Sequence, residues 1–211
     1  MNKVKMYSIA LFATAIATKA QDVSPALKAI DAEQFAKAKS LLKPIAESNG
    51  KAAFLLGNIY LNQEEQDSAR AYFNKGLSSG VSLNNIGLGQ IDLNSNNATA
   101  AQAKFDAATK DAKKKEVEAF VYVARAYMNA DRPDFKKAIT ILNKAKEVNP
   151  TDAQVMLALG DAYYGDKNQN DAYVAYRSAY QLDSSLIRAK MQLGVLLKGA
   201  RAFDGALKAY D

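Results

Sequence analysis

The chain has 211 residues, of which 49% are hydrophobic and 24% are charged. This is the composition of a folded protein, and the length suits one or two ordinary domains or about six copies of a short repeat. The sequence contains neither cysteine nor histidine, which excludes disulfides, thiolate metal sites, catalytic thiols and Ser-His-Asp triads. We therefore expect no catalytic residue, no metal site and no cofactor.

The first twenty residues have the layout of a secretory signal peptide. Lys3 and Lys5 precede an apolar run over residues 6–16, and the small residues Thr18 and Ala20 stand before the expected cleavage site. The run is shorter than the roughly 20 residues of a transmembrane helix. The alternative is an amphipathic first helix of the fold. No cysteine follows the run, which excludes a lipoprotein anchor. The sequence thus predicts export to the periplasm, the outer-membrane periphery or the exterior, with no transmembrane span in the mature chain.

The formal charge of +6 overstates the charge of the exported chain, because Lys3, Lys5 and Lys19 leave with the signal peptide. Residues 21–211 then carry 25 basic and 22 acidic side chains, a net charge of +3. That charge is too small to indicate nucleic-acid binding. The densest basic run, residues 110–115, is interpreted as a solvated connection between helices.

Two prolines mark expected helix boundaries near the start of the folded region. Ser24-Pro25 is a typical helix start, with the Ser24 hydroxyl as N-cap and Pro25 at the first helical position. Pro44 lies inside a helical pattern, so a kink or an early helix end is expected there.

A short pattern recurs five times along the remaining chain. A large apolar residue is followed by Gly or Ala, and this second member recurs at spacings of 32, 35, 36 and 34 residues. An Ala follows this second member by 12 residues, and a large apolar residue follows the Ala by 4 residues. In the third copy the Ala follows by 14 residues, which predicts a longer turn near Ala130–Pro133. These signature positions are Gly57, Gly89, Ala124, Gly160 and Gly194, then Ala69, Ala101, Ala138, Ala172 and Ala206, then Phe73, Phe105, Leu142, Tyr176 and Tyr210.

The pattern closely resembles the tetratricopeptide repeat, a helix–turn–helix unit of about 34 residues with the motif W-x2-L-G-x2-Y…A-x3-F…P. Tyr60, Tyr127 and Tyr163 occupy the motif's Tyr position and Pro150 its closing Pro, whereas no copy has the Trp. The resemblance implies an all-α fold, in which helix pairs stack into a right-handed α-solenoid with a concave groove.

The same register divides residues 21–211 into repeats. It places a partial repeat at 24–49 and further repeats at about 50–81, 82–116, 117–152, 153–186 and 187–211. The last repeat is incomplete, so we expect the natural chain to continue beyond Asp211.

Two structural roles follow from the repeat. A glycine inside a helix costs about 1 kcal/mol relative to alanine, so the repeated glycines are expected to let the paired helices approach closely beside a large aromatic ring. Asn and Gly also recur at the thirteenth position of the unit, where a left-handed conformation that ends the first helix is expected. These residues are Asn62, Asn94, Asn129, Gly165 and Gly199.

Two motif-like segments are interpreted as helix ends and turns. The segment 76–80 fits the G-x-S-x-G pattern of serine hydrolases, but the chain has no histidine to act as the base. The segment 166–170 is similar to the start of a calcium loop, without the Gly and Glu that such a loop requires.

The first helix of each tetratricopeptide unit lines the groove, so the resemblance assigns groove residues by register alone. Amides and charges stand beside apolar residues at these positions, which suits an extended peptide or a partner helix. The family's clamp for chaperone tails is matched only by Asn58, so such tails are not the expected ligand. The predicted groove residues are Phe54, Asn58, Leu61, Gln90, Leu93, Tyr122, Arg125, Met128, Asp161 and Tyr164.

The sequence therefore predicts a non-catalytic scaffold of the bacterial envelope or secretome that binds another protein in its groove. Two alternatives stay open. One is a carrier of glycan or cell-wall material that uses Tyr122, Arg125 and Tyr164. The other is the docking segment of an enzyme whose catalytic domain lies beyond Asp211.

Overall fold

The computed structural model of the chain describes residues 22–79, 83–110 and 117–199. The expected signal peptide, most of the basic run at 110–115 and the signature residues Ala206 and Tyr210 lie outside these ranges. Within them all regular structure is helical, which confirms the predicted all-α class. The helices are α2 (Ser24–Asp31), α3 (Phe35–Leu42), α4 (Gly50–Asn62), α5 (Gln66–Ser78), α6 (Asn84–Asn94), α7 (Ala98–Thr109), α8 (Glu118–Met128), α9 (Phe135–Val148), α10 (Ala153–Gly165), α11 (Gln169–Leu182) and α12 (Ile187–Gly199).

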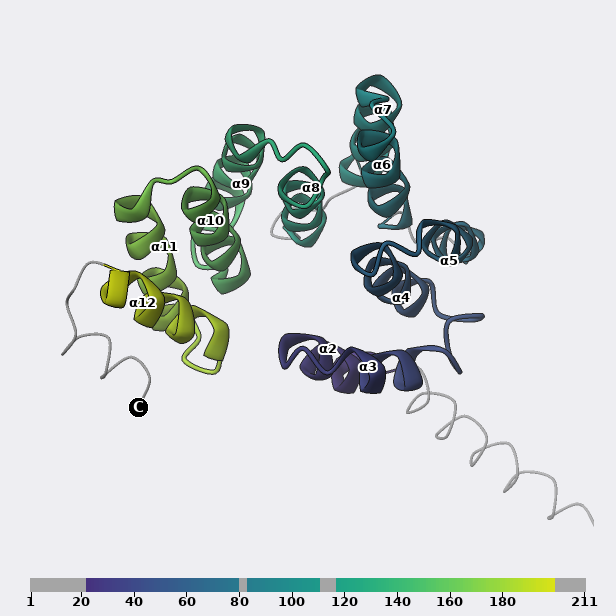
Figure 1. Ribbon diagram of the computed structural model, residues 1–211, viewed down its shortest axis with the longest axis horizontal. Helices are drawn as coiled ribbons and strands as arrows, with labels where there is room; N and C mark the ends of the chain where they lie inside the picture. Colours follow the sequence, from purple (N-terminus) through teal and green to yellow (C-terminus); the bar gives the residue numbers. More distant parts are fainter. Residues whose placement is uncertain (1–21, 80–82, 111–116, 200–211) are drawn as a thin grey trace, which may run out of the picture. The chain divides into compact units, whose positions relative to one another are not determined.

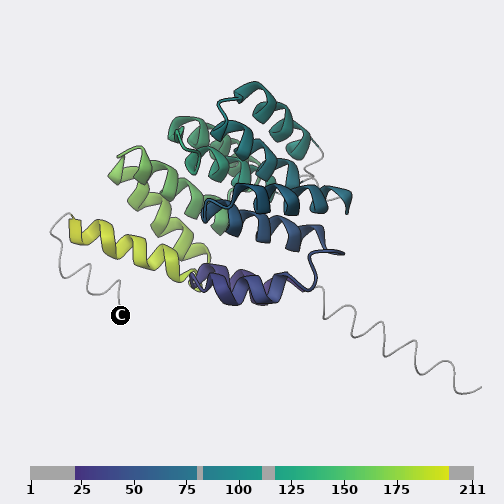
Figure 2. The ribbon, with the colours of Figure 1, turned by 45° about the vertical axis from the view of Figure 1, so that its right-hand side comes forward.

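The chain forms two compact units, Met1–Gly87 and Leu88–Asp211, which divide inside α6. In the first unit α4 packs on both α3 and α5, and in the second α10 packs on both α9 and α11 (Figure 1). The same stacking of α9, α10 and α11 is visible from a second direction (Figure 2). Short turns join the two helices of each pair, so neighbouring helices of a pair run antiparallel. None of the described helices is long and apolar enough to cross a membrane.

The repeated glycines make close contacts with an aromatic ring of the second helix, as predicted. In the first unit a Cβ added at Gly57 would stand 2.6 Å from Cδ1 of Phe73. Phe73 is fully buried and packs against Phe54, with ring centroids 6.1 Å apart. Only glycine leaves room for a ring at this place, because real Cβ atoms are not found so close to another atom. The hairpin α4–α5 is therefore closed by one glycine and two aromatic side chains.

The second unit repeats this arrangement. A Cβ at Gly89 would stand 2.5 Å from Cε1 of Phe105, and one at Gly160 would stand 2.5 Å from Cε1 of Tyr176. The signature alanines Ala101, Ala138 and Ala172 are fully buried. The aromatic residue of the second helix thus fills the space that the glycine leaves in these two repeats as well.

The turns correct the expectation for the thirteenth position. The left-handed residue lies two positions later, at Glu33, Glu64, Asn96 and Lys167, with φ between 56° and 64°. The next amide bonds back to the helix, as Glu65 N does to Tyr60 O at 2.9 Å, which is the Schellman arrangement. Asn62 and Asn94 end their helices without a positive φ.

Gly165 is small for a different reason from the one expected. A Cβ there would stand 2.5 Å from Cδ1 of Phe135, a residue of the preceding repeat. The glycine at this position serves packing between repeats, since its backbone is not left-handed.

The third repeat has the longer turn that the spacing predicted. Its helix-capping residue Asp134 donates its amide to Tyr127 O at 3.0 Å. The carbonyl at the Tyr position thus accepts a backbone hydrogen bond that closes the turn, as in the other repeats. The turn between this carbonyl and the donating amide is two residues longer.

The N-terminal helix boundaries are confirmed in one case and corrected in the other. Helix α3 ends at Leu42, just before Pro44. Ser24, by contrast, is the first residue of α2 and makes no capping bond to the helix. Its amide donates to Asp22 Oδ1 at 2.9 Å, and this bond holds the pKa of the exposed Asp22 carboxyl below its ordinary value. The Asp22 carboxylate, and not the Ser24 hydroxyl, therefore accepts a hydrogen bond from an amide at the start of α2.

Candidate functional site

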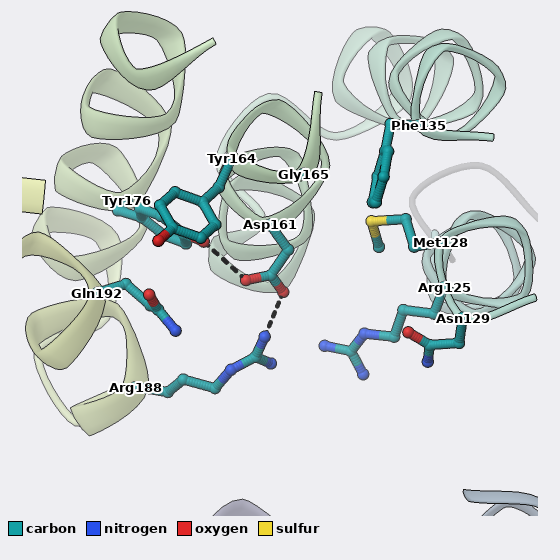
Figure 3. Close-up of a pocket in the computed structure, with 10 residues that line it drawn as sticks. All are labelled: Arg125, Met128, Asn129, Phe135, Asp161, Tyr164, Gly165, Tyr176, Arg188 and Gln192. Atoms are coloured by element: carbon teal, nitrogen blue, oxygen red, sulfur yellow. Dashed lines mark hydrogen bonds and ion pairs between the residues drawn. The ribbon is translucent and has the colours of Figure 1, made fainter. Parts of the chain in front are cut away.

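The second unit contains a pocket of about 400 Å³ between its first helices (Figure 3). Side chains of α8, α10 and α12 form most of the wall, and the second helices α9 and α11 contribute one aromatic residue each. The lining residues are Arg125, Met128, Asn129, Phe135, Asp161, Tyr164, Gly165, Tyr176, Arg188 and Gln192.

Asp161 is the centre of a polar network in this pocket. Its Oδ1 accepts a hydrogen bond from Tyr176 Oη at 2.9 Å, and its Oδ2 pairs with Arg188 Nη2 at 2.5 Å. Burial, and then the Asp161 carboxylate, raise the pKa of Tyr176 far above its ordinary value. The phenol therefore remains a proton donor to Asp161, and the carboxylate holds Arg188 in a defined position on α12.

Arg125 lies on the opposite wall, on α8, and its guanidinium points across the pocket toward Arg188 (Figure 3). It lies 5.8 Å from the centroid of the Tyr122 ring and donates to Gln154 Oε1 at 3.4 Å. In the part of the chain that the structure describes, no carboxylate lies within ion-pair distance of Arg125. The pocket therefore contains two guanidinium groups and one carboxylate, a net charge of +1.

The rest of the wall is less polar. Met128 and Phe135 point toward the same space from α8 and α9 (Figure 3). Tyr164 is 44% exposed, so its ring is accessible to a ligand. An apolar wall beside two cations is a surface that a charged and partly apolar ligand fits.

Four predicted groove residues, Arg125, Met128, Asp161 and Tyr164, meet in the pocket. A fifth, Tyr122, lies against Arg125. Register along the chain was enough to bring these residues together, because the first helices of consecutive repeats lie beside one another.

Two of the other predicted groove residues are corrected. Phe54 is 1% exposed and belongs to the core of the first unit. Gln90 is 7% exposed, and its Nε2 donates to Asn129 O at 3.3 Å. Both side chains are used inside the protein, so neither can serve as a contact for a partner. The remaining three, Asn58, Leu61 and Leu93, are half-buried and do not line the pocket.

Sequence reasoning missed several pocket residues for identifiable reasons. Arg188 and Gln192 occupy groove positions of the last repeat, and the register could have found them. Phe135 and Tyr176 belong to second helices, and only their packing reveals that they reach the pocket.

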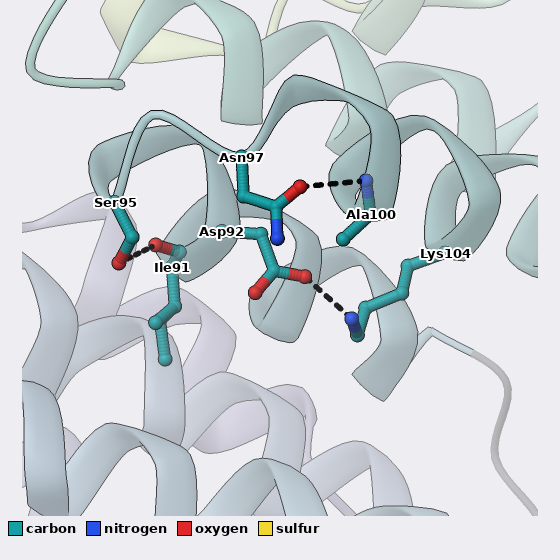
Figure 4. A network of polar contacts seen from close by, with 6 residues as sticks. All are labelled: Ile91, Asp92, Ser95, Asn97, Ala100 and Lys104. Atoms are coloured by element: carbon teal, nitrogen blue, oxygen red, sulfur yellow. Dashed lines mark hydrogen bonds and ion pairs between the residues drawn. The ribbon is translucent and has the colours of Figure 1, made fainter.

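Polar contacts also join the two helices of the second repeat, away from the pocket (Figure 4). Asp92, at the Tyr position of the motif, pairs with Lys104 of α7. Asn97 caps α7 by accepting a hydrogen bond from Ala100 N at 3.2 Å. These contacts hold one hairpin together. In the described residues no three acidic side chains are grouped to hold a metal ion.

Comparison with known proteins agrees with the repeat pattern. A sequence profile of the tetratricopeptide repeat family matches residues 26–80, and four of the five signature copies lie beyond that match. Over residues 26–80 the chain is thus similar to the tetratricopeptide repeat family. No curated protein matches the sequence.

Several solved structures share the tetratricopeptide fold of this chain. The crystal structure of MamA is 20% identical, covers 74% of this chain and 90% of its own, and has a TM-score of 0.50. TTC0263, a thermophilic protein of Thermus thermophilus, is 19% identical over 76% of this chain and 88% of its own, with a TM-score of 0.55. The human IFIT1 dimer with m7Gppp-AAAA is 14% identical over 83% of this chain, with a TM-score of 0.60. The alignment spans 45% of the IFIT1 chain.

Proposed function

We propose that this protein of tetratricopeptide repeat fold is a non-catalytic scaffold, which binds a segment of another protein in the pocket between α8, α10 and α12. Tetratricopeptide repeats generally mediate interactions between proteins. The observation that carries the proposal is the convergence of Arg125, Met128, Asp161 and Tyr164, from successive repeats, on one pocket.

The chemistry of the pocket favours a peptide over a small metabolite. Its donors are guanidinium and amide groups spread over several helices, and its apolar side chains are separated by polar ones. An extended peptide or a helix presents polar and apolar groups at similar intervals.

The site of action is part of the same proposal. The lysine-led apolar segment at residues 1–20 supports export into the bacterial envelope or beyond. N-terminal sequencing of the protein purified from a secreting bacterial host is expected to begin at Gln21. A mature protein that begins at Met1 would contradict export.

The binding proposal is tested with a displayed library of random linear peptides, selected on the purified protein. Peptides that are enriched on the wild type are expected to lose affinity about tenfold or more on the variants Tyr164→Ala and Arg125→Ala. The matched controls are Tyr173→Ala and Arg177→Ala on α11, outside the pocket. Circular dichroism verifies that each variant keeps its helicity.

Two results would contradict the proposal. No enrichment of peptides would do so, as would peptides that bind the pocket variants as well as the wild type. Binding of cell-wall glycan fragments in their place would favour the glycan-carrier alternative.

A further inference from the structure

The sequence contains a single Asn-Gly pair, Asn49-Gly50, which lies at the start of α4. Asparagine deamidates most readily when glycine follows it, because glycine has no side chain to crowd the approach of its own nitrogen to the asparagine side chain. Every other asparagine of the sequence precedes a residue with a side chain. Asn49 is half-buried, and Glu47 and Ser48 just before it are exposed, so this part of the chain lies at the surface.

In the folded protein the side chain of Asn49 is held as the N-cap of α4. Its Oδ1 accepts hydrogen bonds from the amides of Lys51 and Ala52, each at 3.0 Å. Its own amide donates to Ile45 O at 2.9 Å. Deamidation requires Cγ of Asn49 to rotate onto the nitrogen of Gly50, and the two capping bonds resist that rotation. The cap therefore opposes the reaction that the sequence favours.

Gly50 is in turn anchored by a residue of α6. Its carbonyl oxygen accepts a hydrogen bond from Nδ2 of Asn84 at 3.0 Å, and Asn84 is fully buried. Gly76 of α5 lies against the Asn84 amide, where an added Cβ would overlap it. The first turn of α4 is thus connected to α5 and α6 through one side chain, and it opens when that connection loosens.

We propose that Asn49 is a site of spontaneous deamidation, and that the cap of α4 and its anchor Asn84 control the rate. When the first turn of α4 opens, the Gly50 nitrogen gives its proton to water and bonds to Cγ of Asn49. The bond from Cγ to the side-chain nitrogen breaks, and ammonia leaves with a proton taken from water. Water then opens the resulting succinimide at one of its two carbonyl groups, which leaves aspartate or isoaspartate.

The two products have opposite effects on the start of α4. A carboxylate of aspartate accepts the same two amide bonds, and its negative charge is favourable at a helix N-terminus. Isoaspartate continues the main chain through the former side chain, which inserts a methylene group before Gly50 and removes the cap. The first product adds a negative charge and keeps the fold of the first unit, whereas the second separates the start of α4 from Asn84.

The site is tested by incubating the protein at mildly alkaline pH, folded and in urea, and by following the mass of the peptide that contains Asn49. The folded protein is expected to react about tenfold more slowly than the denatured chain, or slower still. Asn97 and Asn168 are internal controls, because they also cap helices but precede Ala98 and Gln169. Both should remain amides while Asn49 reacts, and Gly50→Ala should suppress the reaction in urea.

The control by Asn84 is tested with Asn84→Ala. This variant is expected to deamidate about tenfold faster than the wild type when folded, because the anchor of Gly50 is lost. In urea the two proteins should react at the same rate. The matched variant Asn85→Ala alters a neighbouring half-buried residue and should react like the wild type.

Hydrogen exchange at the amides of Lys51 and Ala52 measures the opening of the cap directly. In the wild type and in Asn84→Ala, the protection of these two amides should equal the ratio of the denatured to the folded deamidation rate. Equal rates in the folded and denatured wild type would overturn the proposal, as would an unchanged folded rate in Asn84→Ala. A rate that does not follow the protection of the two amides would also overturn it, because the cap would then not be the barrier.

Discussion

Gly160 shows at the scale of one residue why the repeat tolerates glycine inside a helix. Its missing side chain leaves the place for Tyr176, which is buried against α10. The variant Gly160→Ala is expected to lower the free energy of unfolding by about 1–3 kcal/mol, because the added methyl group overpacks the core. Urea denaturation measures the change. Gly199, at the end of α12, has no atom within 4 Å of an added Cβ, so Gly199→Ala should not destabilise the protein. Equal losses in the two variants would contradict the packing role.

A second prediction at the scale of one residue concerns Lys167. Its φ of 64° is left-handed, a conformation that costs a residue with a Cβ about 1–2 kcal/mol. Lys167→Gly removes this strain and is expected to stabilise the protein by up to about 1 kcal/mol in thermal or urea unfolding. Lys144→Gly, an exposed position inside α9, is expected to destabilise by about 1 kcal/mol. If both variants change stability in the same direction, strain at Lys167 is not the cause.

At the scale of helices, the bonds of Asp161 connect α10 to α11 through Tyr176 and to α12 through Arg188. The raised pKa of Tyr176 makes this link dependent on pH. A tyrosine in the unfolded chain ionises near pH 10, whereas the buried phenol stays protonated above that value. The stabilisation is therefore complete below about pH 10 and is lost as the pH rises further.

The corresponding prediction concerns Tyr176→Phe. The free energy of unfolding of the wild type, measured by urea denaturation from pH 8 upward, is expected to fall above about pH 10. The variant lacks the ionisable group, so its stability should fall less steeply over the same range. Parallel curves for the two proteins would show that Tyr176 makes no contribution to the pH dependence.

At the scale of the whole molecule, stability is expected to be a sum of local terms, because each repeat contacts only its neighbours. Asn84 allows a test of this in the first unit. It is fully buried, and its Nδ2 donates to Gly50 O at 3.0 Å, which ties the start of α6 to the start of α4. Asn84→Ala is expected to cost about 2 kcal/mol and to reduce hydrogen-exchange protection in α4 and α5.

The same measurement distinguishes local from global coupling. Protection in α10 and α11 should be unchanged in Asn84→Ala, and the neighbouring half-buried Asn85→Ala should change little anywhere. Loss of protection throughout the chain would indicate a single cooperative core and contradict the additive behaviour.

The repeat register, the all-α class and the glycine–aromatic contacts were predictable from the sequence, because each depends on side-chain size at a fixed spacing. Gly57 opposite Phe73 and Gly160 opposite Tyr176 are such contacts. The longer turn before Asp134 was also predictable, from the longer spacing of the third copy. The register also brought Arg125, Met128, Asp161 and Tyr164 to one pocket.

Tertiary packing decided the rest. Phe54 and Gln90 hold groove positions by register, yet neighbouring side chains bury them. Phe135 reaches the pocket from a second helix because Gly165 leaves it room. Arg188 is fixed by Asp161, which lies 27 residues earlier in the chain. Local spacing determines which helix face a residue occupies, whereas its exposure and its partners depend on which other segments fold against that face.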